Sequence, residues 1–244
     1  MKDKDKFELG REFENRINYK FQNFDLLKRA LTHRSWAHER TTSGREETVR
    51  HLHNEAFEFV GDSVLGLAVA ESLYLYFPNL SEGELSLMKH RLVSAISLAQ
   101  AAEKLNLSVY LRMGRGEEKT GGRHKQAILA DAMEATIAAI FLDGGYEAAK
   151  DFVVRIFSED LRTITPTTAI DYKTLLQEKL QAEHRQAPVY TVVRTEGPPH
   201  LRTFFVQAQW DGGQVEGFGT SIKTAAMMAA KYALDILDNK TEQK

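Results

Sequence analysis

The sequence predicts two domains of different class, an all-α domain followed by a small α+β domain of order α-β-β-β-α. Up to about residue 162 the apolar residues recur at helical spacing, and no strand-like alternation of any length occurs. After residue 170, two runs rich in β-branched and aromatic residues indicate strands. The stretch between them is polar and contains a proline, which is typical of a linker. We therefore expect an all-α domain at 7–162, a linker at 163–169 and an α+β domain at 170–239.

Several segments of the first domain carry helix signals. Residues 24–32 have helical apolar spacing, and the long apolar segment 54–76 ends before Pro78. Ser81 and Glu84 form a capping box that begins another helix. Residues 128–142 are rich in Ala, Ile, Met and Leu, and we expect this helix to stop at the glycines that follow. The polar residues 39–50 are expected to form a surface loop.

The second domain begins with a predicted helix at 171–183. Residues 189–193 and 203–210 are predicted strands, and Asp211-Gly212-Gly213 is a hairpin turn into a shorter third strand at 214–217. An alanine-rich helix is expected at 221–237. This order predicts an antiparallel sheet with the helices on one face.

Composition excludes several classes of protein. Of the 244 residues 43% are hydrophobic and 27% are charged, which is the balance of a globular protein with a core. The chain has no cysteine, so disulfides, thiol catalysis and cysteine-ligated metals are excluded. It has no apolar run of membrane-spanning length and no secretory signal, and we expect a cytoplasmic protein without a membrane partner. Because the net charge is −2, binding to a polyanion would need charges segregated onto faces.

Three carboxylates share one face of the predicted helix 54–76. Glu55, Glu58 and Asp62 are three and four residues apart. On spacing alone, a solvated helix face is an equally good interpretation. The neighbouring positions are apolar, however, so we expect this helix to be buried on almost every side. Carboxylates on such a helix must be paired, protonated or bound to metal.

A second predicted helix repeats this situation with Asp131 and Glu134, which lie among small residues that would let another helix approach closely. If the two helices face each other, their carboxylates form a divalent-cation site of hard oxygen ligands. Glu82 would add a further ligand, or would simply face the dipole of its own helix. The motifs of phosphate-binding loops, serine hydrolases and histidine-ligated metal sites are absent from the sequence. An all-carboxylate site favours magnesium and phosphoryl chemistry.

Residues 53–65, HNEAFEFVGDSVL, closely resemble the signature of the ribonuclease III family of double-stranded-RNA endonucleases. Three further segments support the resemblance: ALTHRS at 30–35, GRGEEKTGG at 114–122 and ILADAMEA at 128–135. The part after the linker resembles the double-stranded-RNA-binding domain of bacterial members. The resemblance covers about residues 10–238 in the family's order and spacing.

The resemblance implies roles for the acidic residues. The four that match the family's magnesium ligands are Glu58, Asp62, Asp131 and Glu134. Asp62 and Glu134 match the two that are usually treated as indispensable for catalysis. Glu55 and Glu82 match positions associated with substrate recognition or an accessory metal. The family works as a homodimer whose two sites cut opposite strands, leaving 5′-phosphate and 3′-hydroxyl ends with a short 3′ overhang.

The resemblance also implies an RNA-contacting surface in the second domain. Thr174, Gln177 and Glu178 would contact one minor groove of A-form RNA, and His200 would reach the next. Lys223 would meet phosphates at the start of the last helix. The family usually carries two or three basic residues there, whereas this chain keeps only Lys223 in the first turn. We expect weaker and less salt-sensitive RNA binding from this domain.

These observations favour a Mg²⁺-dependent endonuclease of double-stranded RNA that processes ribosomal, messenger and transfer RNA precursors, with Mn²⁺ able to substitute. The main alternative is a non-catalytic RNA-binding relative, but such a relative would have lost acidic ligands, and all four are present. Another alternative, a helical interaction module that does not act on RNA, gives no reason for the second domain.

Overall fold

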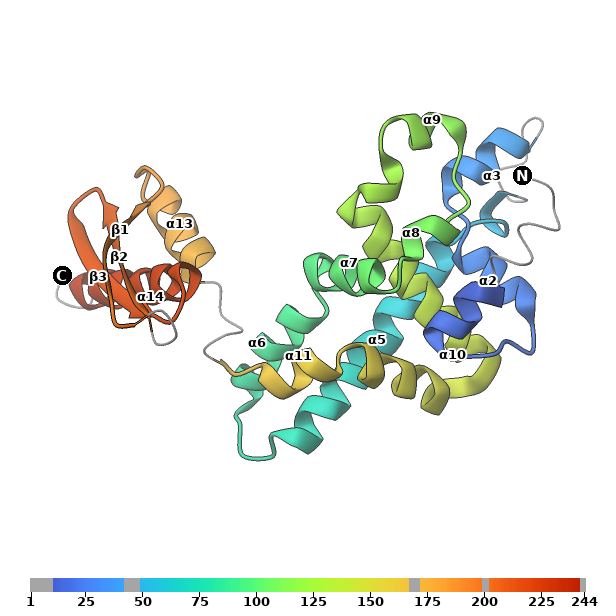
Figure 1. The fold of residues 1–244 in the computed structure, drawn as a ribbon, viewed down its shortest axis with the longest axis horizontal. Helices are drawn as coiled ribbons and strands as arrows, with labels where there is room; N and C mark the ends of the chain where they lie inside the picture. Colours follow the sequence, from blue (N-terminus) through green and yellow to red (C-terminus); the bar gives the residue numbers. More distant parts are fainter. Residues whose placement is uncertain (1–10, 42–48, 167–171, 199–201, 242–244) are drawn as a thin grey trace. The chain divides into compact units, whose positions relative to one another are not determined.

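The computed structural model of the chain describes residues 11–41, 49–166, 172–198 and 202–241. The chain forms two compact units, Met1–Ala169 and Ile170–Lys244. The first is helical and the second combines three strands with two helices, so the predicted fold class is confirmed (Figure 1).

Among its described residues, the first unit has a helical segment at 11–17. Its further named helices, in chain order, are α2 (Phe24–Ala30), α3 (Arg34–Arg40), α5 (Glu55–Tyr76), α6 (Glu82–Leu92), α7 (Ala95–Lys104), α8 (Leu107–Tyr110), α9 (Arg115–Lys119), the 3-10 turn η1 (Gly122–His124), α10 (Gln126–Ile156) and α11 (Ser158–Thr163).

The long helices α5 and α10 pack against each other at the centre of this unit (Figure 1). Their contact is close because Gly61 of α5 has no side chain. A Cβ atom at this position would lie 1.9 Å from the backbone oxygen of Glu134 in α10. Around the crossing, fully buried side chains such as Leu65, Leu73 and Met133 form the core. The crossing therefore fixes where the side chains of α5 meet those of α10.

Most predicted boundaries in this unit hold, with one difference in the predicted loop. The capping box of Ser81 and Glu84 is present, and α2 and α5 lie where the spacing predicts them. The helix expected to stop at the glycines after 142 does so, because Gly145 has a non-helical φ of 79°; a second helix follows it directly within α10 and ends at Ile156. In the predicted loop 39–50, α3 extends to Arg40, and residues 42–48 lie outside the described part of the chain.

The expectation that α5 is buried on almost every side is wrong. Phe59 is 77% exposed, and Leu67 and Tyr74 on the same face are also more than half exposed. The opposite face packs on α10, so the helix is buried on that side only. Among the described helices, α5 alone is long and apolar enough to cross a membrane, a test that core helices of soluble proteins also pass. Packing against α10 buries much of the apolar surface of α5.

The second unit contains α13 (Tyr172–Ala182), β1 (Val189–Glu196), β2 (Thr203–Trp210), β3 (Gly213–Gly219) and α14 (Ile222–Thr241). The strands form an antiparallel sheet of order β1-β2-β3. Helix α14 packs on β2 and β3, and α13 packs on α14. Gly217 permits this close packing, because a Cβ atom there would lie 2.1 Å from the backbone nitrogen of Ala229. β1 and β3 are longer than predicted, while β2 begins and ends at the predicted residues.

Candidate active site

Three carboxylates converge where α5 crosses α10. Oxygen atoms of Glu58, Asp131 and Glu134 all lie within 4.8 Å of one another, and each of these residues is half-buried. Glu58 comes from α5 and the other two from α10, one helical turn apart. The predicted pairing of two acid-bearing helices is therefore present in the fold.

Asp62 lies one turn after Glu58 on α5, at the edge of the exposed face of that helix. It is exposed and is not among the three carboxylates whose oxygens converge. Its negative charge still reaches the cluster, because it raises the pKa of Glu134 and of Glu58. The four predicted residues thus form three close carboxylates with a fourth beside them.

The electrostatics of the cluster favour a bound cation. Burial, followed by the charges of Asp62, Glu58 and Asp131, raises the pKa of Glu134 to about 8. Burial also raises the pKa of Glu58 and of Asp131. Half-buried carboxylates at this separation repel one another unless a proton or a metal ion lies between them. The all-oxygen donor set fits a hard divalent cation such as Mg²⁺.

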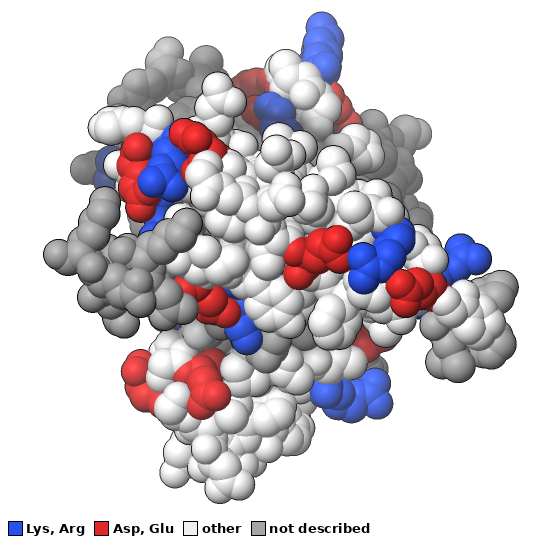
Figure 2. All heavy atoms as spheres, turned by 90° about the vertical axis from the view of Figure 1, so that its left-hand side faces the viewer, with Lys and Arg blue, Asp and Glu red and all other residues white. Residues whose placement is uncertain are grey.

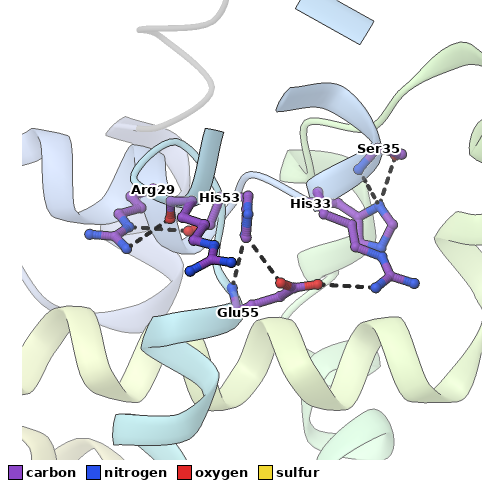
Figure 3. Close-up of polar contacts among 7 residues, drawn as sticks. Arg29, His33, Ser35, His53 and Glu55 are labelled. Carbon is purple, nitrogen blue, oxygen red and sulfur yellow. Dashed lines mark hydrogen bonds and ion pairs between the residues drawn. The ribbon is translucent and has the colours of Figure 1, made fainter. Parts of the chain in front are cut away.

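Glu55, at the first turn of α5, is held by other groups (Figure 3). One carboxylate oxygen accepts a hydrogen bond from Arg34 at 3.2 Å, and the other lies 3.8 Å from Nδ1 of His53. His53 is only 4% exposed, and burial lowers its pKa, so the ring is neutral near pH 7. The backbone N–H of Glu55 donates to the same Nδ1 at 3.4 Å. Glu55 is therefore fixed at the edge of the cluster.

A loop network supports this edge of the site. Arg29 donates hydrogen bonds to the backbone oxygens of His53 and Arg50 (Figure 3). His33 caps α3 by accepting a hydrogen bond from the backbone N–H of Ser35. These contacts hold the segments before α3 and α5 beside the carboxylates.

A cavity of about 540 Å³ lies beside the cluster. Its lining residues are His33, Arg34, Asn54, Glu55, Glu58, Glu117, Lys125, Ala127, Ile128 and Asp131. Glu117 and Lys125 are not predicted as site residues, although Glu117 lies in the GRGEEKTGG segment and Lys125 follows it closely. A larger cavity of about 590 Å³, lined by Trp36 and Arg112 among others, contains none of the clustered carboxylates. The smaller cavity, which Glu58 and Asp131 line, therefore gives access to the carboxylate cluster.

Glu82 is not brought to the cluster within one chain. It lies at the start of α6 and accepts a hydrogen bond from the hydroxyl of Ser86 at 2.9 Å. It borders a different, mostly apolar cavity of about 470 Å³, which is also lined by Leu73, Tyr74 and Leu85. Of the two accessory acidic residues, only Glu55 borders the carboxylate cavity.

In the second unit, Thr174, Gln177 and Glu178 are exposed on α13, and Lys223 is exposed at the start of α14. The hydroxyl of Ser221 accepts a hydrogen bond from the backbone N–H of Thr224 and so caps α14. His200 lies outside the described residues. Among the described residues on the face drawn in Figure 2, charges of both signs are scattered and form no continuous basic patch.

Comparison with known proteins identifies both units. A family model described as Ribonuclease-III-like matches residues 23–161, and one for the double-stranded RNA binding motif matches residues 172–237. Ribonuclease 3 of Magnetococcus marinus is 46% identical over 229 residues, covering 92% of this chain and 91% of the relative. Ribonuclease 3 of Clostridium acetobutylicum is 42% identical over 233 residues, covering 95% of this chain and 98% of the relative.

Solved structures agree with these matches. A structure of the nuclease domain of ribonuclease III from Campylobacter jejuni is 38% identical and superposes with a TM-score of 0.54. The match covers 61% of this chain and 95% of the Campylobacter jejuni chain. Its description concerns flexibility in a region involved in dimer formation. The carboxylates of α5 and α10 lie within the part matched by the nuclease family.

Proposed function

This chain belongs to the ribonuclease III family and is an endoribonuclease, and from that premise we propose that it hydrolyses phosphodiester bonds of double-stranded RNA with a bound Mg²⁺ ion. The observation that carries the proposal is the convergence of Glu58, Asp131 and Glu134 within 4.8 Å at the edge of an open cavity. We assign the nuclease activity to residues 7–162 and RNA binding to residues 170–239, with 163–169 as the linker.

Glu58, Asp62, Asp131 and Glu134 would hold the ion, and Asp62 and Glu134 would be the main catalytic residues. A bound Mg²⁺ would polarise the phosphate and supply a water of lowered pKa for in-line attack. The protein contributes the fixed geometry of the carboxylates. The pKa of about 8 at Glu134 means that this group holds a proton near neutral pH when no cation is present. Mn²⁺ would substitute, because it accepts the same oxygen ligands.

The exposed face of α5 supports a homodimer. Phe59, Leu67 and Tyr74 form an apolar strip along one side of the helix, and large apolar patches are typical of protein interfaces. In a two-fold pairing centred near Leu67, the antiparallel helices would place Phe59 of one copy against the C-terminal half of α5 in the other. The cavity bordered by Glu82 lies at that half. Glu82 would therefore serve the active site of the second copy.

The second unit would bind the duplex through its helices. Thr174, Gln177 and Glu178 are exposed on one helix, where they would contact 2′-hydroxyls across a minor groove. Lys223 and the free N–H groups at the start of α14 would contact phosphates. His200 would reach the next minor groove. With one cation in the first turn of α14, this domain would bind more weakly than a domain with several.

Two active sites acting on opposite strands would leave 5′-phosphate and 3′-hydroxyl ends with a short 3′ overhang. The substrates would be double-stranded regions of ribosomal RNA precursors and of structured messenger and transfer RNA transcripts, in the cytoplasm. Membership of the family supports both statements, and the pairing of two sites in a dimer would account for the overhang.

Cleavage of a long RNA duplex, with and without Mg²⁺, tests this function. We expect cutting with Mg²⁺ or Mn²⁺, none in excess chelator, and little cutting of single-stranded RNA of the same sequence. Because Ca²⁺ is larger and coordinates more loosely, it should support binding but little cutting. End labelling of the products would identify the 5′-phosphate. Full activity in excess chelator would rule out the carboxylate site, and binding without cleavage in Mg²⁺ would identify a non-catalytic relative.

A further inference from the structure

The wall of the carboxylate cavity carries a fixed ammonium group. Lys125 directly precedes α10 and stands six residues before Asp131 in the sequence. Its Nζ atom donates a hydrogen bond to Oε1 of Glu117 at 2.7 Å and another to the hydroxyl of Thr120 at 3.3 Å. Both Lys125 and Glu117 line the cavity that Glu58 and Asp131 also line. A positive group is therefore held on the same cavity as the cluster.

The ammonium group keeps one donor available. A lysine ammonium has three N–H donors, and two of them are used by Glu117 and Thr120. Within the described part of the chain, Lys125 has no third hydrogen-bond partner. Its side chain is 48% exposed, whereas that of Glu117 is 24% exposed. Lys125 lowers the pKa of Glu117, so the pair is ionised at neutral pH.

Glu117 and Thr120 also explain why Lys125 does not neutralise the cluster. A flexible ammonium beside Glu58 and Asp131 would be attracted to them and would compete with a metal ion. The ion pair on α9 instead holds it on the cavity wall. Arg34, the other strongly basic residue of the cavity, is bonded to Glu55. The cavity is thus lined by carboxylates that would bind a cation and, apart from them, by the fixed ammonium group of Lys125 with one free N–H donor.

We propose that Lys125 binds a non-bridging oxygen of a phosphate in the RNA strand that is cut, and that Glu117 and Thr120 position it. A phosphodiester strand suits both the carboxylate cluster and the ammonium group. One phosphate would face the cluster, and a neighbouring phosphate would accept a hydrogen bond from the ammonium group. The inference rests on the proposed function, since it concerns the strand bound at the nuclease site. Lys125 is a substrate-binding residue, and Glu117 acts through it.

Three variants of the full chain test the role of the charge. Lys125→Gln removes the charge but leaves the backbone that begins α10, and we expect kcat/KM on a short RNA duplex to fall about tenfold, as for loss of a hydrogen bond to a charged group. Lys125→Arg should recover most of this loss. Lys104→Gln is the matched control, because Lys104 on α7 is also paired with an acid, Asp160, but does not line the cavity. It should cut like the parent.

A second measurement locates the phosphate. Duplexes that each carry one neutral methylphosphonate, placed in turn near the scissile bond, would be cut by the parent and by Lys125→Gln. At one position the methylphosphonate should lower the kcat/KM of the parent about tenfold and that of Lys125→Gln almost not at all, because the neutral group and the substitution remove the same contact. Glu117→Gln should weaken this coupling while Lys125 remains present. Melting temperatures of all the variants would show that they are folded.

The outcomes separate the inference from the proposed function. If the parent does not cut duplex RNA, the proposed function fails. If the parent cuts and Lys125→Gln cuts equally well, or if the losses add at every methylphosphonate position, the inference on Lys125 is wrong while the carboxylate site stands.

Discussion

Substitution of Gly61 by alanine tests whether the close crossing of α5 and α10 builds the active site. A Cβ atom at this position would lie 1.9 Å from the backbone oxygen of Glu134 and 2.4 Å from its carbonyl carbon. A carbon and a carbonyl oxygen normally approach no closer than about 3.3 Å. Since both groups belong to helix backbone or are fixed to it, no rotamer change can relieve the overlap. The helices must separate by roughly 1 Å or more at the residue that carries the catalytic carboxylate.

Two effects set the size of the expected change. Overpacking of this kind costs about 1–3 kcal/mol, and the gain from replacing a helical glycine by alanine offsets about 0.5–1 kcal/mol of it. We expect the melting temperature of the nuclease unit to fall by several degrees, at about 2–4 °C per kcal/mol. The displacement of Glu134 relative to Glu58 should reduce cleavage about 100-fold, as for a reactive group misplaced by about 1 Å.

The assay pairs thermal unfolding with single-turnover cleavage, both on the full chain and well below the melting temperature. Gly66→Ala is the matched control on the same helix, because the nearest atoms to its added Cβ are the end of the flexible Lys89 side chain, at 3.6 Å. This variant should be as stable as the parent or slightly more so, and it should cut at the parent rate. If Gly61→Ala also keeps both its melting temperature and its rate, then the close crossing does not position the carboxylates.

Three further predictions concern the cluster and the exposed face of α5. Glu134→Gln removes a charge but little volume, so cleavage should fall about 1000-fold, equivalent to about 4 kcal/mol, while the affinity for duplex RNA holds or rises; a rate within threefold of the parent would exclude Glu134 as a ligand. Because the pKa of Glu134 is raised from 4.5 to about 8 in the folded chain, its stabilising contribution is complete below about pH 4.5 and is lost as the pH rises through 8. The gain in melting temperature on adding Mg²⁺ should therefore be larger at pH 8 than at pH 5.5, and an equal gain would contradict a metal site at this carboxylate. Phe59→Ser should convert a dimer into monomers in sedimentation experiments and reduce cleavage, whereas Phe218→Ser, at a phenylalanine of the second unit that is also more than half exposed, should leave the dimer intact; a dimeric Phe59→Ser protein would place the interface elsewhere.

Local sequence determined most of the elements. The capping box of Ser81 and Glu84 and the exact extent of β2 follow from side chains that act on their own backbone or alternate along a single strand. The spacing of Asp131 and Glu134 likewise placed both carboxylates on one side of a helix before any packing was known. These features depend on neighbours in the chain, so the sequence alone predicts them.

Tertiary packing decided what the local signals leave open. The end of a helix at Gly145 follows from the sequence, but the second helix that begins directly after it depends on packing, because its Phe152 and Val153 are buried in the core. The apolar side chain of Phe59 indicates a buried position from sequence, but only the crossing with α10 determines which side of α5 is covered. In the same way, the bond between Lys125 and Glu117 depends on how the chain folds back onto the start of α10. The sequence by itself determined which residues could form the site. The close approach of the two helix backbones at Gly61 decided which carboxylates meet, because the distance between packed helices is set by all the side chains between them.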